Sequence, residues 1–219
     1  MTVISLVNQK GGVSKSTTSV HLAYWLIEKK KRKTLLIDAD SQRSSSLWVE
    51  GMEDIKIPCE VIGSPDDLLE RVPELAADYD YLIVDGPASL SEATRAILFR
   101  SDLAFIPVQP TGVDLRSASD AMRLVKQAQS VRGGLPKAVM FLSRAVKGTK
   151  LKDEAILYWA KIQKQSYSIQ SFIKNRRSLT LLDNRLQYGT YQEDLLVSLH
   201  QNTKHYLKNF SINYHDQKA

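Results

Sequence analysis

A glycine-containing loop near the N-terminus constrains the fold of this 219-residue chain more than any other feature. The loop spans residues 8–18, follows an apolar run at residues 3–7 and precedes a helical pattern that begins near Val20. A strand, such a loop and a helix in this order are typical of phosphate binding, because backbone N–H groups and the helix N-terminus both face the anion. The spacing therefore predicts an α/β domain with a phosphate site after its first strand.

The side chains in this loop suit phosphate chemistry. Gly11 and Gly12 have no Cβ atom, so the backbone can bend sharply and approach an anion closely. Lys15 can neutralise phosphate charge, and the Ser16 hydroxyl can ligate Mg²⁺. A surface turn with chance lysines is the alternative interpretation of the same residues.

The order of residues in the loop is K-G-G-x-x-K-[ST], with a second lysine, Lys10, at its entrance. This order resembles the deviant Walker A loop of the ParA/MinD family of ATPases, most closely the short ParA-type partition and positioning ATPases. The resemblance implies that ATP and Mg²⁺ bind here, that Lys15 and Lys10 act in catalysis, and that Lys10 reaches the ATP of a partner chain. The nucleotide-binding residues that it predicts in the loop are Lys10, Gly11, Gly12, Val13, Ser14, Lys15, Ser16 and Thr17.

Two acidic residues end two further apolar runs. Residues 34–37 lead into Asp38, and residues 81–84 lead into Asp85. Carboxylates at the carboxyl ends of strands lie where open α/β sheets bind ligands, and their oxygens are the ligands that Mg²⁺ prefers. We therefore expect Asp85 to hold a magnesium ion through water beside the Ser16 hydroxyl, and the resemblance implies that Asp38 lies close to the same ion.

The neighbours of these acids resemble the two switch segments of the family. Asp38 and Asp40 match its D-x-D-P-Q segment, with Ser41 in place of the proline, and Asp85-Gly86-Pro87 matches the start of its second switch. The resemblance implies that Asp40 orients or activates the attacking water. It also implies that Ser143 and Arg144 bind the nucleotide, with Ser143 at the position of the asparagine that relatives use against the adenine.

The apolar runs and helical patterns predict one domain over residues 1–219. We expect a doubly wound, mostly parallel sheet flanked by helices, of the P-loop NTPase type. Further short strands are expected near residues 55–62, 103–108 and 138–142. Helices are expected at residues 91–100 and from Asp114 to about residue 132, and further helices after residue 150, one of which carries Leu179, Leu182 and Leu186.

Positive charge is concentrated in the last third of the chain. Residues 1–139 contain 17 Lys and Arg against 18 Asp and Glu, whereas residues 140–219 contain 13 against 6. Such an excess favours a polyanionic partner, although a merely soluble basic surface would have the same composition. The candidates for contacts to DNA phosphates, without readout of bases, are Lys150, Lys174, Arg176 and Arg177.

The resemblance implies an ATPase that is slow and stimulated by a partner. As an ATP-bound homodimer it would bind non-specific double-stranded DNA and segregate or position a plasmid, a chromosome or a carboxysome-like cargo, with a cargo-bound adaptor protein stimulating hydrolysis. One cysteine excludes a disulfide framework and no apolar run reaches the ~18 residues of a membrane helix, so we expect a cytoplasmic protein. The resemblance, with the DNA binding that it implies, adds that the protein associates with the nucleoid. The alternatives are a MinD-like membrane-cycling ATPase and a metabolic, ligase-type ATP-dependent relative.

Overall fold

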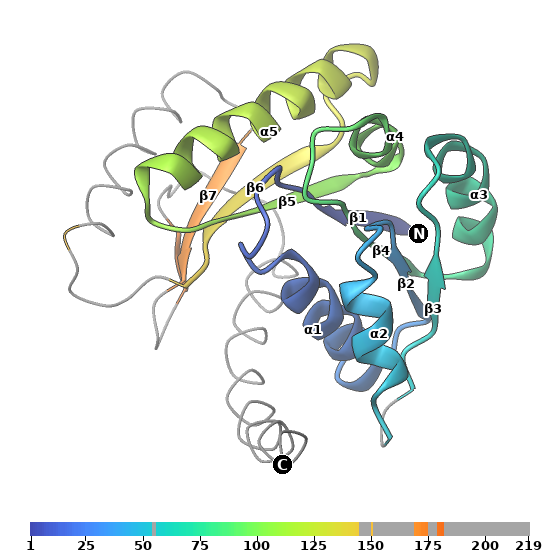
Figure 1. Cartoon of the computed structure of the whole chain (residues 1–219). Helices are drawn as coiled ribbons and strands as arrows, with labels where there is room; N and C mark the ends of the chain where they lie inside the picture. Colours follow the sequence, from blue (N-terminus) through green and yellow to red (C-terminus); the bar gives the residue numbers. More distant parts are fainter. Residues whose placement is uncertain (54–55, 145–149, 151–168, 175–178, 182–219) are drawn as a thin grey trace.

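The fold is built on one twisted sheet in a computed structural model that describes residues 1–53, 56–144, 150, 169–174 and 179–181 (Figure 1). The strand order is β3-β2-β4-β1-β5-β6-β7-β8. Every neighbouring pair from β3 to β7 is parallel, and only β8 at the edge runs antiparallel to β7. The predicted mostly parallel sheet is therefore confirmed.

Most elements of the first 142 residues were predicted, but the helix at residues 44–50 was not, and the strand expected near residues 55–62 covers only residues 59–61. The strands are β1 (Thr2–Leu6), β2 (Thr34–Asp38), β3 (Cys59–Val61), β4 (Tyr81–Asp85), β5 (Leu103–Val108), β6 (Lys137–Leu142), β7 (Ile169–Lys174) and β8 (Leu179–Leu181). The helices are α1 (Lys15–Glu28), α2 (Ser44–Glu50), α3 (Pro65–Asp78), α4 (Glu92–Arg100) and α5 (Gly112–Val131). The last of these begins two residues before the predicted start, because the Thr111 hydroxyl caps it by accepting a hydrogen bond from the Asp114 N–H.

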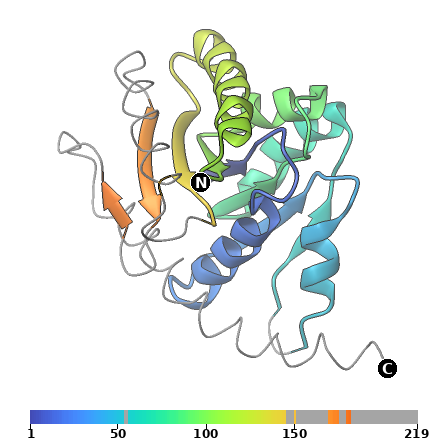
Figure 2. The ribbon, with the colours of Figure 1, turned by 60° about the vertical axis from the view of Figure 1, so that its left-hand side comes forward.

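Helices cover both faces of the sheet. Figure 1 shows α1 and α2 on one face and α3, α4 and α5 on the other, and Figure 2 shows the same layers from a second direction. Strand side chains alternate between the two cores: Leu35 and Ile37 of β2 pack with α3–α5, whereas Leu36 packs with α1 and α2. Because both faces are buried, the strands appear in the sequence as continuous apolar runs and not as alternating patterns.

The structure corrects one predicted helix in the last third of the chain. Leu179 begins strand β8, which pairs with β7 (Phe172↔Leu181), whereas a helix was predicted there. A short apolar run has no periodicity that separates a strand from a buried helix, and here the free edge of β7 decides the outcome. Leu182 and Leu186, which the same helix was expected to carry, lie outside the described residues.

No helix among the described residues is both long enough and apolar enough to cross a membrane.

Candidate nucleotide site

The predicted site residues come together at the carboxyl edge of the sheet. The last residue of β1, Leu6, pairs in register with Asp85 at the end of β4, and Asp85 pairs with Asp38 at the end of β2. The loop that follows β1 and the two carboxylates are therefore neighbours, as the parallel arrangement requires. Figure 1 shows the loop from β1 entering α1 at this edge.

The backbone of the loop shows the conformation of Ser14, whose position is a glycine in the common phosphate-loop pattern G-x-x-x-x-G-K-[ST]. Gly12 has φ 72° and Ser14 has φ 77°, so both adopt the left-handed conformation. Glycine adopts it freely, whereas any other residue pays about 1–2 kcal/mol. Ser14 occupies the position before the helix where that pattern has its second glycine, and it keeps the glycine-like conformation at this cost.

Lys15 is almost completely buried at the start of α1. Its Nζ donates a hydrogen bond to the Lys10 carbonyl oxygen at 3.2 Å. Burial lowers the pKa of Lys15, and the negative charges of Asp85 and Asp40 act in the opposite direction. A lysine ammonium group in this loop, within the electrostatic influence of two carboxylates, is placed to meet phosphate charge.

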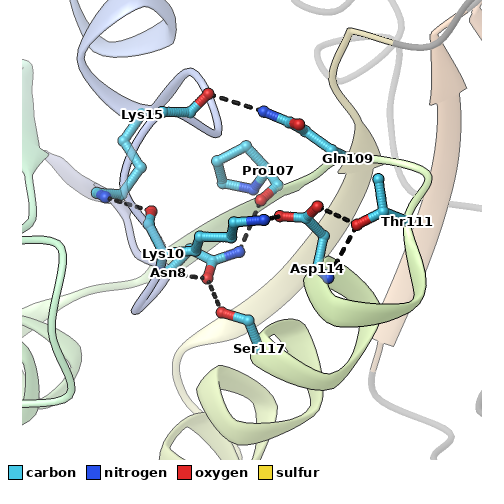
Figure 3. A network of polar contacts seen from close by, with 9 residues as sticks. Asn8, Lys10, Lys15, Pro107, Gln109, Thr111, Asp114 and Ser117 are labelled. Carbon is cyan, nitrogen blue, oxygen red and sulfur yellow. Dashed lines mark hydrogen bonds and ion pairs between the residues drawn. The ribbon is translucent and has the colours of Figure 1, made fainter.

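Lys10 forms an ion pair with its own chain. Figure 3 shows its side chain directed toward α5, where Nζ lies 2.9 Å from Asp114 Oδ1. The Lys10 side chain is 39% exposed, whereas that of Asp114 is fully buried. Asp114 also contacts the Thr111 hydroxyl through its second oxygen, so the carboxylate is fixed on both sides.

Helix α5 and Gln109, which precedes it, hold the loop at further points, and Figure 3 shows the contacts of Asn8 and Gln109. Asn8 Oδ1 accepts hydrogen bonds from the Ser117 hydroxyl at 2.6 Å and from the Lys10 N–H at 3.0 Å. Gln9 donates to Asp120 at 3.1 Å, and the side chain of Gln109 donates to the Gly12 carbonyl at 2.8 Å. Sequence reasoning missed this layer of contacts, whose only signal is the polar spacing of Asp114, Ser117 and Asp120 along one helix face.

Asp38 and Asp85 have different surroundings. The two oxygens of Asp38 accept the backbone N–H groups of Asp40 at 3.1 Å and of Ser46 at 2.8 Å, so this carboxylate fixes the loop that leads into α2. Asp85 accepts from the Ser19 hydroxyl at 3.1 Å through Oδ1, whereas Oδ2 makes no hydrogen bond of standard length among the described residues. A buried carboxylate that lies beside a second carboxylate and is surrounded by serine hydroxyls fits a divalent cation.

Burial raises the pKa of Asp85 to about 6. The hydroxyls of Ser16, Ser45 and Ser19 lower it, and the charge of Asp38 raises it. The pKa of Asp85 in the folded protein lies above its ordinary value of 3.8, so ionised Asp85 destabilises the folded protein when no metal is bound. This loss of folding stability is absent below about pH 4 and complete above pH 6. A cation at this position would offset the cost by neutralising the charge.

Replacing Asp85 with asparagine should raise the stability of the metal-free protein at neutral pH. In EDTA at pH 7.5, we expect the Asp85→Asn variant to be more stable than the natural protein by about 2–3 kcal/mol, because a shift of one pKa unit corresponds to 1.36 kcal/mol. Thermal unfolding at pH 7.5 and at pH 4.5 measures the change. The exposed Asp66→Asn variant is the control. An equal difference between Asp85→Asn and the natural protein at both pH values would contradict this explanation.

The other predicted site residues lie at or near the same edge. Asp40 is half-buried and, together with Pro87, lines a cavity of about 470 Å³. Val13 is buried and Thr17 is exposed. Ser143 is buried directly after β6, and its hydroxyl makes no hydrogen bond to the described part of the chain.

The neighbouring Arg144 is exposed and adopts a left-handed φ of 52°. The proposed roles of these side chains toward nucleotide remain predictions.

The candidate DNA contacts are only partly within the described residues. Lys150 is exposed, and Lys174 ends β7 at the same sheet edge as the loop. Arg176 and Arg177 lie outside the described residues. The DNA surface therefore remains a prediction from composition.

The fold and the arrangement of the loop define the class of this protein: it is an α/β protein with a P-loop NTPase-like fold. A family model described as "AAA domain" matches residues 1–65, which include the loop, β2 and α2. The maintenance of carboxysome distribution protein A (McdA) of Gloeobacter kilaueensis is 37% identical over 115 residues, which are 52% of this chain and 51% of that protein. The chromosome-partitioning ATPase Soj of Thermus thermophilus is 30% identical over 161 residues, 60% of this chain and 63% of that protein.

These comparisons confirm the resemblance that the loop indicates: the proteins similar to this chain include McdA, Soj and ParA proteins. The matched region spans only about half the length of the first of them.

Solved structures confirm the fold over most of the chain. Apo McdA of Cyanothece superposes with a TM-score of 0.63 at 16% identity and covers 94% of both chains. Cobyrinic acid a,c-diamide synthase of Mycobacterium smegmatis, with bound ADP and magnesium, gives a TM-score of 0.57 at 20% identity over 74% of this chain and 82% of that one. At these identities the likeness shows the common fold alone.

Proposed function

We propose that this chain is a ParA-type ATPase that binds ATP and Mg²⁺, dimerises around two nucleotides and binds non-specific DNA in the ATP state. One observation carries the proposal: two lysines of one loop and two carboxylates of neighbouring strands meet at a single edge of the sheet. The relatives that match by sequence support it, because they are partition and positioning proteins. The whole chain, residues 1–219, would act as one domain.

The residues of the loop have distinct roles in the proposed reaction. Backbone N–H groups from Gly11 to Thr17 bind the phosphates, and Lys15 neutralises their charge. Asp40 orients the attacking water, which suits a reaction that depends on alignment and electrostatics more than on covalent help. Ser143 and Arg144 bind the nucleotide, with Ser143 beside the adenine.

Mg²⁺ would be held by Ser16, Asp38 and Asp85, and it would supply charge neutralisation at the phosphates. The structure gives Asp38 an additional role, because its oxygens already position the Asp40 loop through backbone hydrogen bonds. Asp85 is the stronger candidate to hold the metal, because its Oδ2 makes no hydrogen bond of standard length among the described residues.

Lys10 is the residue that would couple hydrolysis to dimerisation. In the dimer it reaches the phosphates of the partner's ATP and adds positive charge where the transition state needs it. The dimer also brings together two copies of the basic surface, so affinity for DNA and its dependence on salt both increase. An adaptor protein on the cargo stimulates hydrolysis. Hydrolysis then separates the two chains, which release the DNA. The protein would act in the cytoplasm, on the DNA of the nucleoid.

Titration of a random-sequence DNA duplex tests the proposal. We expect fluorescence anisotropy to show binding with ATP–Mg²⁺ and at least about tenfold weaker binding with ADP–Mg²⁺, and the ATP-state affinity should fall steeply between 50 and 200 mM salt. Equal binding in both states, or no binding in either, would contradict DNA binding gated by ATP. A membrane-cycling or a metabolic ATPase would then be favoured.

A further inference from the structure

Lys10 is held within its own chain by three separate interactions. Its Nζ pairs with Asp114 at 2.9 Å, its N–H donates to Asn8 at 3.0 Å, and its carbonyl accepts from Lys15 at 3.2 Å (Figure 3). The side-chain partner is unusual for a surface lysine, because Asp114 is fully buried and its position is fixed by Thr111. A pair with one buried and immobile member loses less to solvent screening and side-chain entropy than an exposed pair.

This pairing conflicts with the role that we propose for Lys10 in the dimer. If the Lys10 ammonium group touched Asp114 and a triphosphate at the same time, Asp114 would lie within about 6 Å of the triphosphate. The several negative charges of the triphosphate would repel Asp114 more than the single charge of Lys10 attracts it. We therefore expect Lys10 to leave Asp114 before it serves the partner's nucleotide. Each dimer would break two such pairs.

The third interaction links this exchange to nucleotide binding. The ammonium group of Lys15, which we propose to bind phosphate, donates to the carbonyl of Lys10. When Lys15 turns to a phosphate oxygen, the backbone of residue 10 loses that hydrogen bond. Nucleotide binding in one chain would then loosen the lysine that the other chain needs.

We infer that Asp114 is a positioning residue that holds Lys10 in its own chain and so opposes dimerisation until nucleotide occupies the loop. This inference rests on the proposed function, because it assigns Lys10 a second partner in the dimer. It adds a restraint to that function, because Asp114 in the single chain and the partner's nucleotide in the dimer compete for the ammonium group of Lys10.

The Asp114→Asn variant removes the charge with little change of shape, and Asp120→Asn is its matched control. Asp120 lies on the same helix and contacts Gln9 instead of Lys10. Asp114→Ser is a second variant in case the buried asparagine prevents folding, which thermal unfolding detects. Two quantities are measured for the natural protein and for each variant. The first is the rate at which limiting acetic anhydride labels the Lys10 amine, which mass spectrometry compares with the labelling of Lys31. The second is the dimerisation constant, from sedimentation velocity with ATP–Mg²⁺.

We expect Lys10 in Asp114→Asn to be labelled several-fold faster in the single chain and the dimerisation constant to tighten about tenfold. A tenfold change corresponds to 1.4 kcal/mol shared between the two pairs of each dimer. The Asp120→Asn control, which removes the contact to Gln9 and leaves the Lys10–Asp114 pair, should not speed the labelling of Lys10. In the natural protein, ADP–Mg²⁺ should speed the labelling of Lys10.

Unchanged labelling in both Asp114 variants overturns the inference, and so does a dimer that is weakened or unaffected while labelling increases. Labelling that ADP–Mg²⁺ leaves unchanged overturns the link through Lys15. Failure of the natural protein to dimerise with ATP would instead contradict the proposed function. The labelling readout, which needs only the single chain, would still decide whether Asp114 restrains Lys10.

Discussion

Replacing Lys10 with alanine should reduce the rate of ATP hydrolysis by at least about 100-fold, because it removes a positive charge aimed at the developing transition state. The affinity for ADP should stay within about threefold, since Lys15 and the loop backbone remain in place. Steady-state phosphate release measures the first quantity, and fluorescence of a labelled ADP measures the second. Lys31→Ala, which removes an exposed lysine outside the site, should match the natural protein.

The Lys10→Ala variant needs a second control because it leaves the buried Asp114 without its cation. An unpaired buried charge destabilises a protein, so the variant should also melt at a lower temperature. The double variant Lys10→Ala, Asp114→Asn should recover most of that stability and none of the hydrolysis. Recovery of hydrolysis together with stability would show that Lys10 acts only through the fold and would contradict its role at the partner's nucleotide.

Replacing Gly86 with alanine should destabilise the protein by about 2–3 kcal/mol, as overpacking of a rigid core does. A Cβ atom at this position would lie 2.7 Å from the carbonyl oxygen of Leu6, which also accepts the Gly86 N–H at 3.0 Å. Backbone of the central strand cannot move aside without breaking that hydrogen bond. Because Gly86 directly follows Asp85, we also expect weaker Mg²⁺-dependent nucleotide binding.

Gly63→Ala is the matched control for this substitution. An added Cβ at Gly63 would meet no atom within 4 Å, and its φ is not left-handed, so stability should change by less than about 0.5 kcal/mol. Thermal unfolding of the two variants gives the comparison. Equal stability of both would show that the sheet edge at β1 and β4 adapts to the extra atom.

The sequence predicted the sheet and the loop well because both depend on short-range patterns. The strands at residues 34–38, 81–85 and 103–108 were predicted to the residue, since strands buried on both faces are continuous apolar runs between polar boundaries. The loop was found from seven residues whose spacing fits a strand–loop–helix turn. Asp38 and Asp85 followed from the rule that acids at strand ends gather at one edge.

The contacts that hold the loop could not be predicted in the same way. Lys10 and Asp114 are far apart in the sequence, and nothing local in either segment identifies its partner. The sequence also could not show that both oxygens of Asp38 are used by backbone N–H groups, or that Ser14 takes a left-handed conformation. Such facts depend on how α5 and α2 pack onto the sheet edge. Strand β8 was missed for a related reason, because the free edge of β7 decided it.

The molecular mass in the presence of each nucleotide tests the central claim most directly. In sedimentation velocity with ATP–Mg²⁺, the 24.7 kDa chain should form a species of twice that mass as concentration rises, and with ADP–Mg²⁺ it should stay at the mass of one chain. Lys10→Ala should stay at the mass of one chain with both nucleotides. The same mass with ATP and with ADP in the natural protein would contradict a dimer assembled around two ATP molecules.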